Sequence, residues 1–344
     1  MENIKHTLPP EILNLLHSGT VIPAHPLALD NDGNFDEAGQ RTLTQYYMNS
    51  GAGGVAVGVH TTQFEIREKG IELYEPVLKI VADELKTVNK SFIKVAGVCG
   101  PTDQAINEAK IAKNLGYDLA LLSMGGLQHY SEDELVERTR LVAEIIPVFG
   151  FYLQPAVGGR ILSYHFWEKF AAIENVHAIK IAAFNRYQTL DVVRAVCNSP
   201  RRDAIALYTG NDDNIIADLL TPYRFEIDGQ QIEKRFVGGL LGHWAFCTEY
   251  AVNTLKEVKH CIGNNYAGVE HLLAKNIEVT DANAAAFDVA NNFRGCIAGI
   301  HEMLRREGVM KNIKCLKDHE VISAGQMEEI ERVCKLYFPH LAGK

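Results

Sequence analysis

The sequence lacks the features that identify several large classes of protein. It has no run of basic residues, and its 34 Lys and Arg against 43 Asp and Glu give a formal net charge of −9, which argues against nucleic acid as a partner. Its longest mostly apolar stretches, such as residues 51–59, are well short of the ~20 residues of a membrane-spanning helix. The N-terminal residues, with Glu2 and Lys5, lack the apolar stretch of a signal peptide, so we expect a cytoplasmic protein without membrane contact.

Cysteine pairs and phosphate-binding glycine loops are also missing. The seven cysteines are odd in number and none are spaced like metal ligands, so we interpret them as reduced, mostly buried thiols. Gly51, Gly53 and Gly54 precede a strand and therefore do not form the dinucleotide-binding fingerprint, which follows one. We expect no cofactor.

The chain does contain strand and helix patterns in alternation. Apolar, β-branched segments begin near Thr20, Gly54, Phe92, Asp118, Pro147, Val176, Ala204 and Phe236. Most gaps between them have helical periodicity, as in residues 132–146, where Ser131 and Glu134 form a capping box. Eight strand–helix units with short connections predict an α/β fold, a (β/α)8 barrel of about 250 residues.

Two segments add to this barrel. Asp228-Gly229 lies between the seventh and eighth units and predicts a β-hairpin inserted near residues 224–236, on the face opposite the site. After residue 262 only helices are predicted. We expect residues 1–262 to form the barrel, with a short N-terminal lead, and residues 263–344 to form a C-terminal helical extension packed on it.

Strand alternation suggests which side chains face the barrel interior. In the sixth strand, Ile179 and Ile181 are assigned to the helices and Lys180 to the interior. Burial favours the neutral amine of a lysine, which is the nucleophile of Schiff-base chemistry. The alternative is a lysine at the strand tip that pairs with a carboxylate.

The neighbouring strands supply polar partners for this lysine. If Phe151 and Leu153 face outward, Tyr152 faces the interior beside Lys180 and could carry protons there; the alternative is a core tyrosine with a hydrogen-bonded hydroxyl. At the end of the second strand His60 is also expected inward. The loop that follows it could hold a carboxylate, or could simply be a polar loop end.

Several motifs, in this order, resemble those of the dihydrodipicolinate synthase and N-acetylneuraminate lyase family of class I aldolases. Tyr152-Leu-Gln-Pro155 is similar to the family's Tyr-Asn-x-Pro motif, and Ile179-Lys180, with the lysine 28 residues after the tyrosine, is similar to its Schiff-base lysine. Gly210-Asn-Asp-Asp213 and Gly239-Leu-Leu-Gly242 resemble shorter motifs of the seventh and eighth strands. The resemblance runs from about residue 18 to residue 335.

The resemblance implies a lyase in which Lys180 forms a Schiff base with pyruvate or another 2-oxo acid. Aldol cleavage or condensation, with an aldehyde as partner, or dehydration would follow. Tyr152 would carry protons, and either His60 or Thr61 would replace the family's relay threonine or the relay would be altered. The implied substrate-binding residues are Gly58, Thr61, Thr62, Gly239, Leu241 and His243. The implied assembly is a homotetramer or homodimer.

Substrate choice and two other functions stay open. Val157 stands where dihydrodipicolinate synthases carry an arginine, so this segment looks more like that of the sugar-acid aldolases and lyases. His60, His129 and His243 fall near predicted strand ends and could bind zinc in a metal-dependent aldolase or hydrolase, although no ligand spacing supports a metal site. A barrel that binds a small acid without catalysis is the third possibility.

Overall fold

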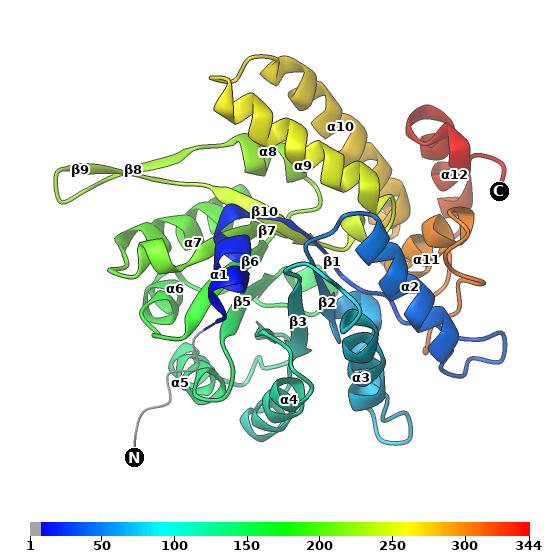
Figure 1. Cartoon of the computed structure of the whole chain (residues 1–344), viewed down its shortest axis with the longest axis horizontal. Coiled ribbons are helices and arrows are strands. Elements are labelled where there is room, and N and C mark those ends of the chain that lie inside the picture. Colours follow the sequence, from blue (N-terminus) through cyan, green and yellow to red (C-terminus); the bar gives the residue numbers. More distant parts are fainter. Residues whose placement is uncertain (1–7) are drawn as a thin grey trace.

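The computed structural model describes residues 8–344, and it confirms the predicted barrel (Figure 1). Eight parallel strands follow the order β1-β10-β7-β6-β5-β4-β3-β2, and a parallel bridge between Ala24 and Ala56 joins the two ends of this order. The strands are β1 (Val21–Pro23), β2 (Gly54–Val57), β3 (Ile93–Val98), β4 (Leu119–Ser123), β5 (Val148–Leu153), β6 (Val176–Ala182), β7 (Ala206–Thr209) and β10 (Phe236–Leu241). Each predicted strand start lies within two residues of the observed one.

Helices surround this ring of strands (Figure 1). They are α2 (Glu37–Asn49), α3 (Tyr74–Leu85), α4 (Thr102–Asn114), α5 (Glu132–Ala143), α6 (Tyr164–Ala171), α7 (Arg186–Asn198), α8 (Ile215–Leu220) and α9 (Thr248–Gly263). The predicted capping box begins α5: Ser131 Oγ accepts a hydrogen bond from Glu134 N at 3.2 Å, and the Glu134 carboxylate accepts one from Ser131 N at 2.7 Å. Local residue chemistry therefore fixes where this helix starts.

The N-terminal end of the barrel is filled. Helix α1 (Pro10–Ser18) lies across it, and its Ile12 and Leu16 pack against inward side chains of the strands. The hydroxyl of Tyr208 on β7 donates to Leu16 O at 2.9 Å. With this end filled, a site is left to the C-terminal ends of the strands, where barrel enzymes carry their active sites.

The predicted hairpin is present. Strands β8 (Tyr223–Ile227) and β9 (Gln230–Lys234) pair antiparallel and project from the barrel (Figure 1). Asp228 and Gly229 between them have φ of 50° and 75°, and two left-handed residues in a two-residue loop match the right-handed twist of the flanking strands. The hairpin precedes β10, at the N-terminal ends of the barrel strands.

Helices follow the barrel, as predicted, and the longer ones are α10 (Val269–Ala286), α11 (Cys296–Arg306) and α12 (Gln326–Tyr337). Arg332 of α12 makes a two-fold ion pair with Asp281 of α10, each bond being 2.8 Å. The link between α10 and α11 reaches the C-terminal ends of the strands, so the extension does more than cover the barrel wall. The division of the chain at residue 262 stays a prediction.

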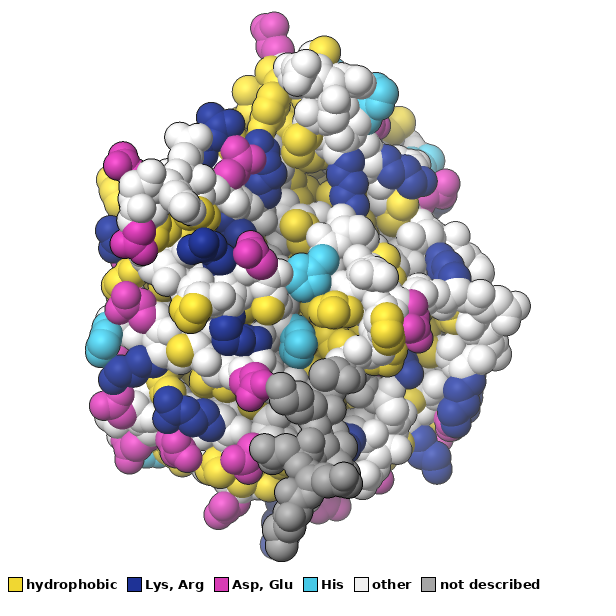
Figure 2. Space-filling model, turned by 60° about the vertical axis from the view of Figure 1, so that its left-hand side comes forward, with side chains coloured by type: hydrophobic (Ala, Val, Ile, Leu, Met, Phe, Trp, Pro, Cys, Tyr) yellow, Lys and Arg dark blue, Asp and Glu magenta, His cyan; other side chains and the backbone are white. Residues whose placement is uncertain are grey.

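The surface carries charged side chains of both signs (Figure 2), as expected from the numbers of acidic and basic residues in the sequence. On the face in Figure 2, acidic and basic side chains are interspersed. Within residues 8–344, no helix has the length and apolar character needed to cross a bilayer.

Candidate active site

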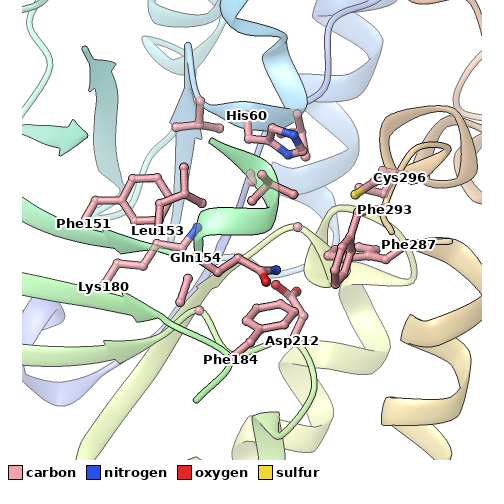
Figure 3. Close-up of a pocket in the computed structure, with 18 residues that line it drawn as sticks. His60, Phe151, Leu153, Gln154, Lys180, Phe184, Asp212, Phe287, Phe293 and Cys296 are labelled. Atoms are coloured by element: carbon pink, nitrogen blue, oxygen red, sulfur yellow. The ribbon is translucent and has the colours of Figure 1, made fainter. Parts of the chain in front are cut away.

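A pocket opens at the C-terminal ends of the barrel strands (Figure 3). It encloses about 50 Å³, and about 550 Å³ with its solvent-open mouth included. Lys180 comes from β6, Asp212 from the loop after β7, and His60 from the loop after β2. The link between α10 and α11 closes the far side. The pocket thus combines the barrel mouth with the C-terminal extension.

Lys180 lies in this pocket, on the inner face that the sequence predicted. Its side chain is 7% exposed, and its Nζ lies 4.4 Å from the centroid of the Phe151 ring. Within residues 8–344 the ammonium has no hydrogen-bond or ion-pair partner. Burial lowers the pKa of Lys180 to about 8, although the nearby Asp212 opposes this shift. Gly210 provides space, because a Cβ there would lie 2.5 Å from Lys180 Cε.

Asp212 is the carboxylate that faces this lysine. It is buried, and its Oδ1 accepts a hydrogen bond from His243 N at 2.9 Å. Burial raises the pKa of Asp212 to about 7, while Lys180 opposes the shift. Asp212 is not among the predicted site residues, although the sequence contains a signal for it, since Gly210-Asn-Asp-Asp213 follows a barrel strand.

His60 and Thr61 form the opposite side of the pocket, in the short 3₁₀ helix η1 (His60–Thr62). Burial, together with the positive Lys180, lowers the pKa of His60 to about 4, so its imidazole is neutral at pH 7. The Thr61 hydroxyl is buried and has no hydrogen-bond partner within the described part of the chain. A buried unpaired hydroxyl is costly unless a ligand or water satisfies it.

The predicted inward orientation of Tyr152 is wrong. In the β5–β6 register Phe151 stands opposite Lys180, so Phe151 shares its face and Tyr152 takes the other. Tyr152 packs against Trp167 of α6, with ring centroids 5.2 Å apart, and its hydroxyl accepts a hydrogen bond from Leu162 N at 3.3 Å. The prediction assumed that the bulky side chains of this strand face the helices, and here they face the barrel interior. The barrel interior is wide enough for Phe151, while Gly150 faces outward and leaves room for a phenylalanine of α6.

Thr62 and Gly58 hold the β2 loop rather than line the pocket. The Thr62 hydroxyl accepts from Gly58 N at 2.9 Å and from Val59 N at 3.2 Å, and it donates to His25 O at 2.6 Å. Gly58 has φ of 76°, and a Cβ on it would point at Tyr74 of α3. Of these three loop residues only Thr61 lines the pocket, and nothing in the sequence pattern separates it from Thr62 and Gly58.

The three predicted residues around β10 also face away from the pocket. A Cβ on Gly239 would lie 2.6 Å from the Trp244 ring, and Leu241 packs in the outer, helix-facing core. His243 turns its ring toward Phe246, with centroids 4.7 Å apart. His243 contributes its backbone N–H, which donates a hydrogen bond to Asp212 Oδ1. Gly242 is the residue of this segment that does line the pocket.

The histidines considered as zinc ligands do not share one cavity. His60 lines the pocket, His243 faces a separate cavity beside Trp244, and His129 packs on Tyr130. His25 is hydrogen-bonded to Thr44. Within residues 8–344, no three His, Cys, Asp or Glu side chains are grouped as a metal site.

Comparison with known proteins identifies the relatives of this barrel. Residues 17–221 match the Dihydrodipicolinate synthetase family. The chain belongs to this family. The family comprises pyruvate-dependent Schiff-base aldolases and lyases. No curated protein shows significant similarity to the sequence.

Solved structures share the fold of this family member at low sequence identity. YagE from E. coli K12, in complex with pyruvate, is 16% identical with a TM-score of 0.74, covering 92% of this chain and 98% of its own. N-acetylneuraminate lyase from Fusobacterium nucleatum is 18% identical with a TM-score of 0.72, covering 93% and 99%. CdNal from Clostridium difficile, in complex with mannosamine, is 15% identical with a TM-score of 0.73, covering 93% and 99%. At this level of identity the likenesses show the fold alone.

Three phenylalanines that line the pocket were not predicted from the sequence. Phe184 follows β6, whereas Phe287 and Phe293 belong to the link between α10 and α11 (Figure 3). Nothing in the sequence pattern distinguishes these phenylalanines from core residues. The three rings share one wall because the C-terminal extension packs over the barrel mouth. Phe287 and Phe293 lie more than 100 residues after Phe184 in the chain.

The position of Tyr152 has a testable consequence. We expect Tyr152→Phe to keep kcat within about threefold of the wild type, because the hydroxyl does not reach the pocket, and to lower the free energy of unfolding by about 1 kcal/mol, because Leu162 N loses its acceptor. Urea unfolding and steady-state kinetics measure the two effects. A loss of turnover without a loss of stability would restore the catalytic role of Tyr152.

Proposed function

We propose that Lys180 forms a Schiff base with pyruvate or another 2-oxo acid and that the protein is a class I lyase. The observation that carries this proposal is a buried lysine at the end of a barrel strand, with a lowered pKa and no ion-pair partner in the described residues. Above about pH 8 such a lysine is largely a neutral amine, whereas an ordinary lysine is still charged there. The enclosed volume of about 50 Å³, which is open to the mouth, suits a small 2-oxo acid.

Asp212 is proposed as the group that moves protons beside Lys180. The neutral amine attacks the ketone carbon of the acid, and a proton passes from the attacking nitrogen to the ketone oxygen, which gives a carbinolamine. Protonated Asp212 then gives a proton to the departing hydroxyl, which leaves as water, and an iminium forms. The Asp212 carboxylate next accepts a proton from the adjacent carbon, which yields the enamine. Its raised pKa, about 7, suits both directions of transfer.

Thr61 and His60 are proposed to hold the carboxylate of the acid. The Thr61 hydroxyl can donate the hydrogen bond that it does not make within the protein. The neutral His60 imidazole can donate one more. Val157 lines the pocket and supplies no charge for a second carboxylate, so a monocarboxylic acid is favoured.

The orientation of Tyr152 favours one other function, a barrel that binds a 2-oxo acid without turnover. Borohydride trapping separates the two. The protein is incubated with pyruvate, reduced with borohydride, digested, and analysed by mass spectrometry. A reduced adduct on Lys180 supports the lyase. Binding in calorimetry without any adduct, for pyruvate and several other 2-oxo acids, would leave the non-catalytic barrel.

Adjacent threonines provide a matched pair for the carboxylate site. Thr61→Val is expected to raise KM for the 2-oxo acid about tenfold with little change in melting temperature, because it removes a hydroxyl without a partner inside the protein. Thr62→Val is expected to lower stability by about 1–3 kcal/mol, because it breaks the three hydrogen bonds of that hydroxyl. Equal effects of the two changes on KM would contradict the assignment.

A further inference from the structure

Away from Lys180, most of the side chains that line the pocket are apolar. In Figure 3, Phe287 and Phe293 lie on the side of the pocket away from Lys180, and Phe184 lies beside Asp212. The apolar wall consists of Leu153, Val157, Phe184, Phe287, Phe293 and Ile300. A second substrate that approaches the bound 2-oxo acid from the mouth therefore contacts mainly these apolar side chains.

Two of these phenylalanines have unusual backbone conformations. Phe184 and Phe293 have φ of 50° and 65°, a region that bulky side chains rarely adopt and that costs free energy. Phe184 N donates to Asn211 Oδ1 at 3.0 Å, which holds the strained residue in place. The two rings meet edge to face, with centroids 6.0 Å apart and planes at 74°. Strained residues of this kind cluster at ligand sites.

Polar contacts at this wall are few. Besides the Asp212 carboxylate and the Cys296 thiol, the side-chain amide of Gln154 is the polar group at this wall, and within residues 8–344 it makes no hydrogen bond (Figure 3). One amide can bind one aldehyde oxygen. The several hydroxyls of a sugar would lose water at the phenylalanine rings and find no replacement partners.

We propose that the second substrate is an aldehyde with an aryl or branched alkyl group, rather than a polyhydroxylated sugar. This inference rests on the proposed function. The enamine carbon bonds to the aldehyde carbon, and the aldehyde oxygen takes up the proton that the same carbon had released to form the enamine. Water then hydrolyses the iminium, which frees the Lys180 amine and a 4-hydroxy-2-oxo acid. No oxidant or reductant is needed.

The test compares acceptors on the full chain with pyruvate as donor. We expect kcat/KM for benzaldehyde and 3-methylbutanal to exceed that for D-glyceraldehyde and N-acetylmannosamine by about 100-fold, the order by which apolar pockets discriminate against hydroxyls. Trapping with pyruvate alone is run in parallel. An adduct on Lys180 with equal or better use of the hydroxylated acceptors would overturn the inference and leave the lyase standing. Absence of the adduct would overturn both.

Variants locate the selectivity in the phenylalanine wall. Phe293→Ser is expected to reduce the ratio of kcat/KM for benzaldehyde to that for glyceraldehyde by about tenfold, and Phe184→Leu to reduce it less. Ile277→Ser is the matched control, because Ile277 on α10 is 65% exposed and lies outside the pocket. Melting temperatures are recorded for all three. A ratio unchanged in folded Phe293→Ser would contradict the role of this ring.

Discussion

Lys180→Ala is expected to abolish the borohydride-trapped adduct and to lower kcat by about 10⁴-fold or more, because no other described side chain in the pocket offers a nucleophilic amine. The fold should tolerate the change. Lys180 is desolvated and without an ion pair in the described residues, and its side chain borders space that is already open. Trapping, steady-state kinetics and a thermal melt measure the three effects.

Lys180→Arg is the control that keeps the positive charge. A guanidinium stays protonated and does not form imines, so this variant should be as inactive as Lys180→Ala while preserving the charge opposite Asp212. Collapse of the melting temperature with normal specific activity in the remaining folded protein would show that Lys180 is structural. Activity in Lys180→Arg would show that charge, rather than nucleophilicity, is what the pocket requires.

Asp212→Asn is expected to separate imine formation from turnover. The Asp212 carboxylate raises the pKa of Lys180, so its removal lowers that pKa below about 8 and shifts the pH midpoint of imine formation downward. Turnover should fall by about 10²–10³-fold, because the proposed proton carrier is gone. Asp213→Asn is the neighbouring control: Asp213 is exposed and lies outside the pocket, and its charge only helps to raise the pKa of Asp212, so turnover should stay near that of the wild type. Loss of turnover in both variants alike would contradict the assignment.

The pH profile of the wild type follows from the same two groups. Attack needs the neutral amine, whose fraction grows as pH rises through about 8, and loss of water needs protonated Asp212, whose fraction shrinks as pH rises through about 7. Because the groups titrate as a pair, kcat/KM should follow a bell with its maximum between about pH 7 and pH 8. In Asp212→Asn the falling limb should disappear.

The sequence by itself determined the architecture. Eight β-branched segments separated by helical periodicity specified the barrel, and Asp228-Gly229 specified the hairpin, because strand spacing and turn chemistry are local properties of the chain. It also determined that Lys180 faces inward, since the small Ala178 and Ala182 flank it on the same face. Asp212 could also have been predicted from the sequence, because it is an acidic residue just after the C-terminal end of a barrel strand.

Only the tertiary structure decided which neighbours Lys180 has. Strand alternation predicts that Phe151 and Tyr152 face opposite ways. Which of them faces inward depends on the width of the barrel and on Gly150, whose missing side chain leaves room for a phenylalanine of α6 on the outer face. Likewise, Phe293 reaches the pocket only because the extension packs over the barrel mouth. Periodicity constrains residues a few positions apart, whereas the face that a side chain takes and the partners it meets depend on packing between distant elements.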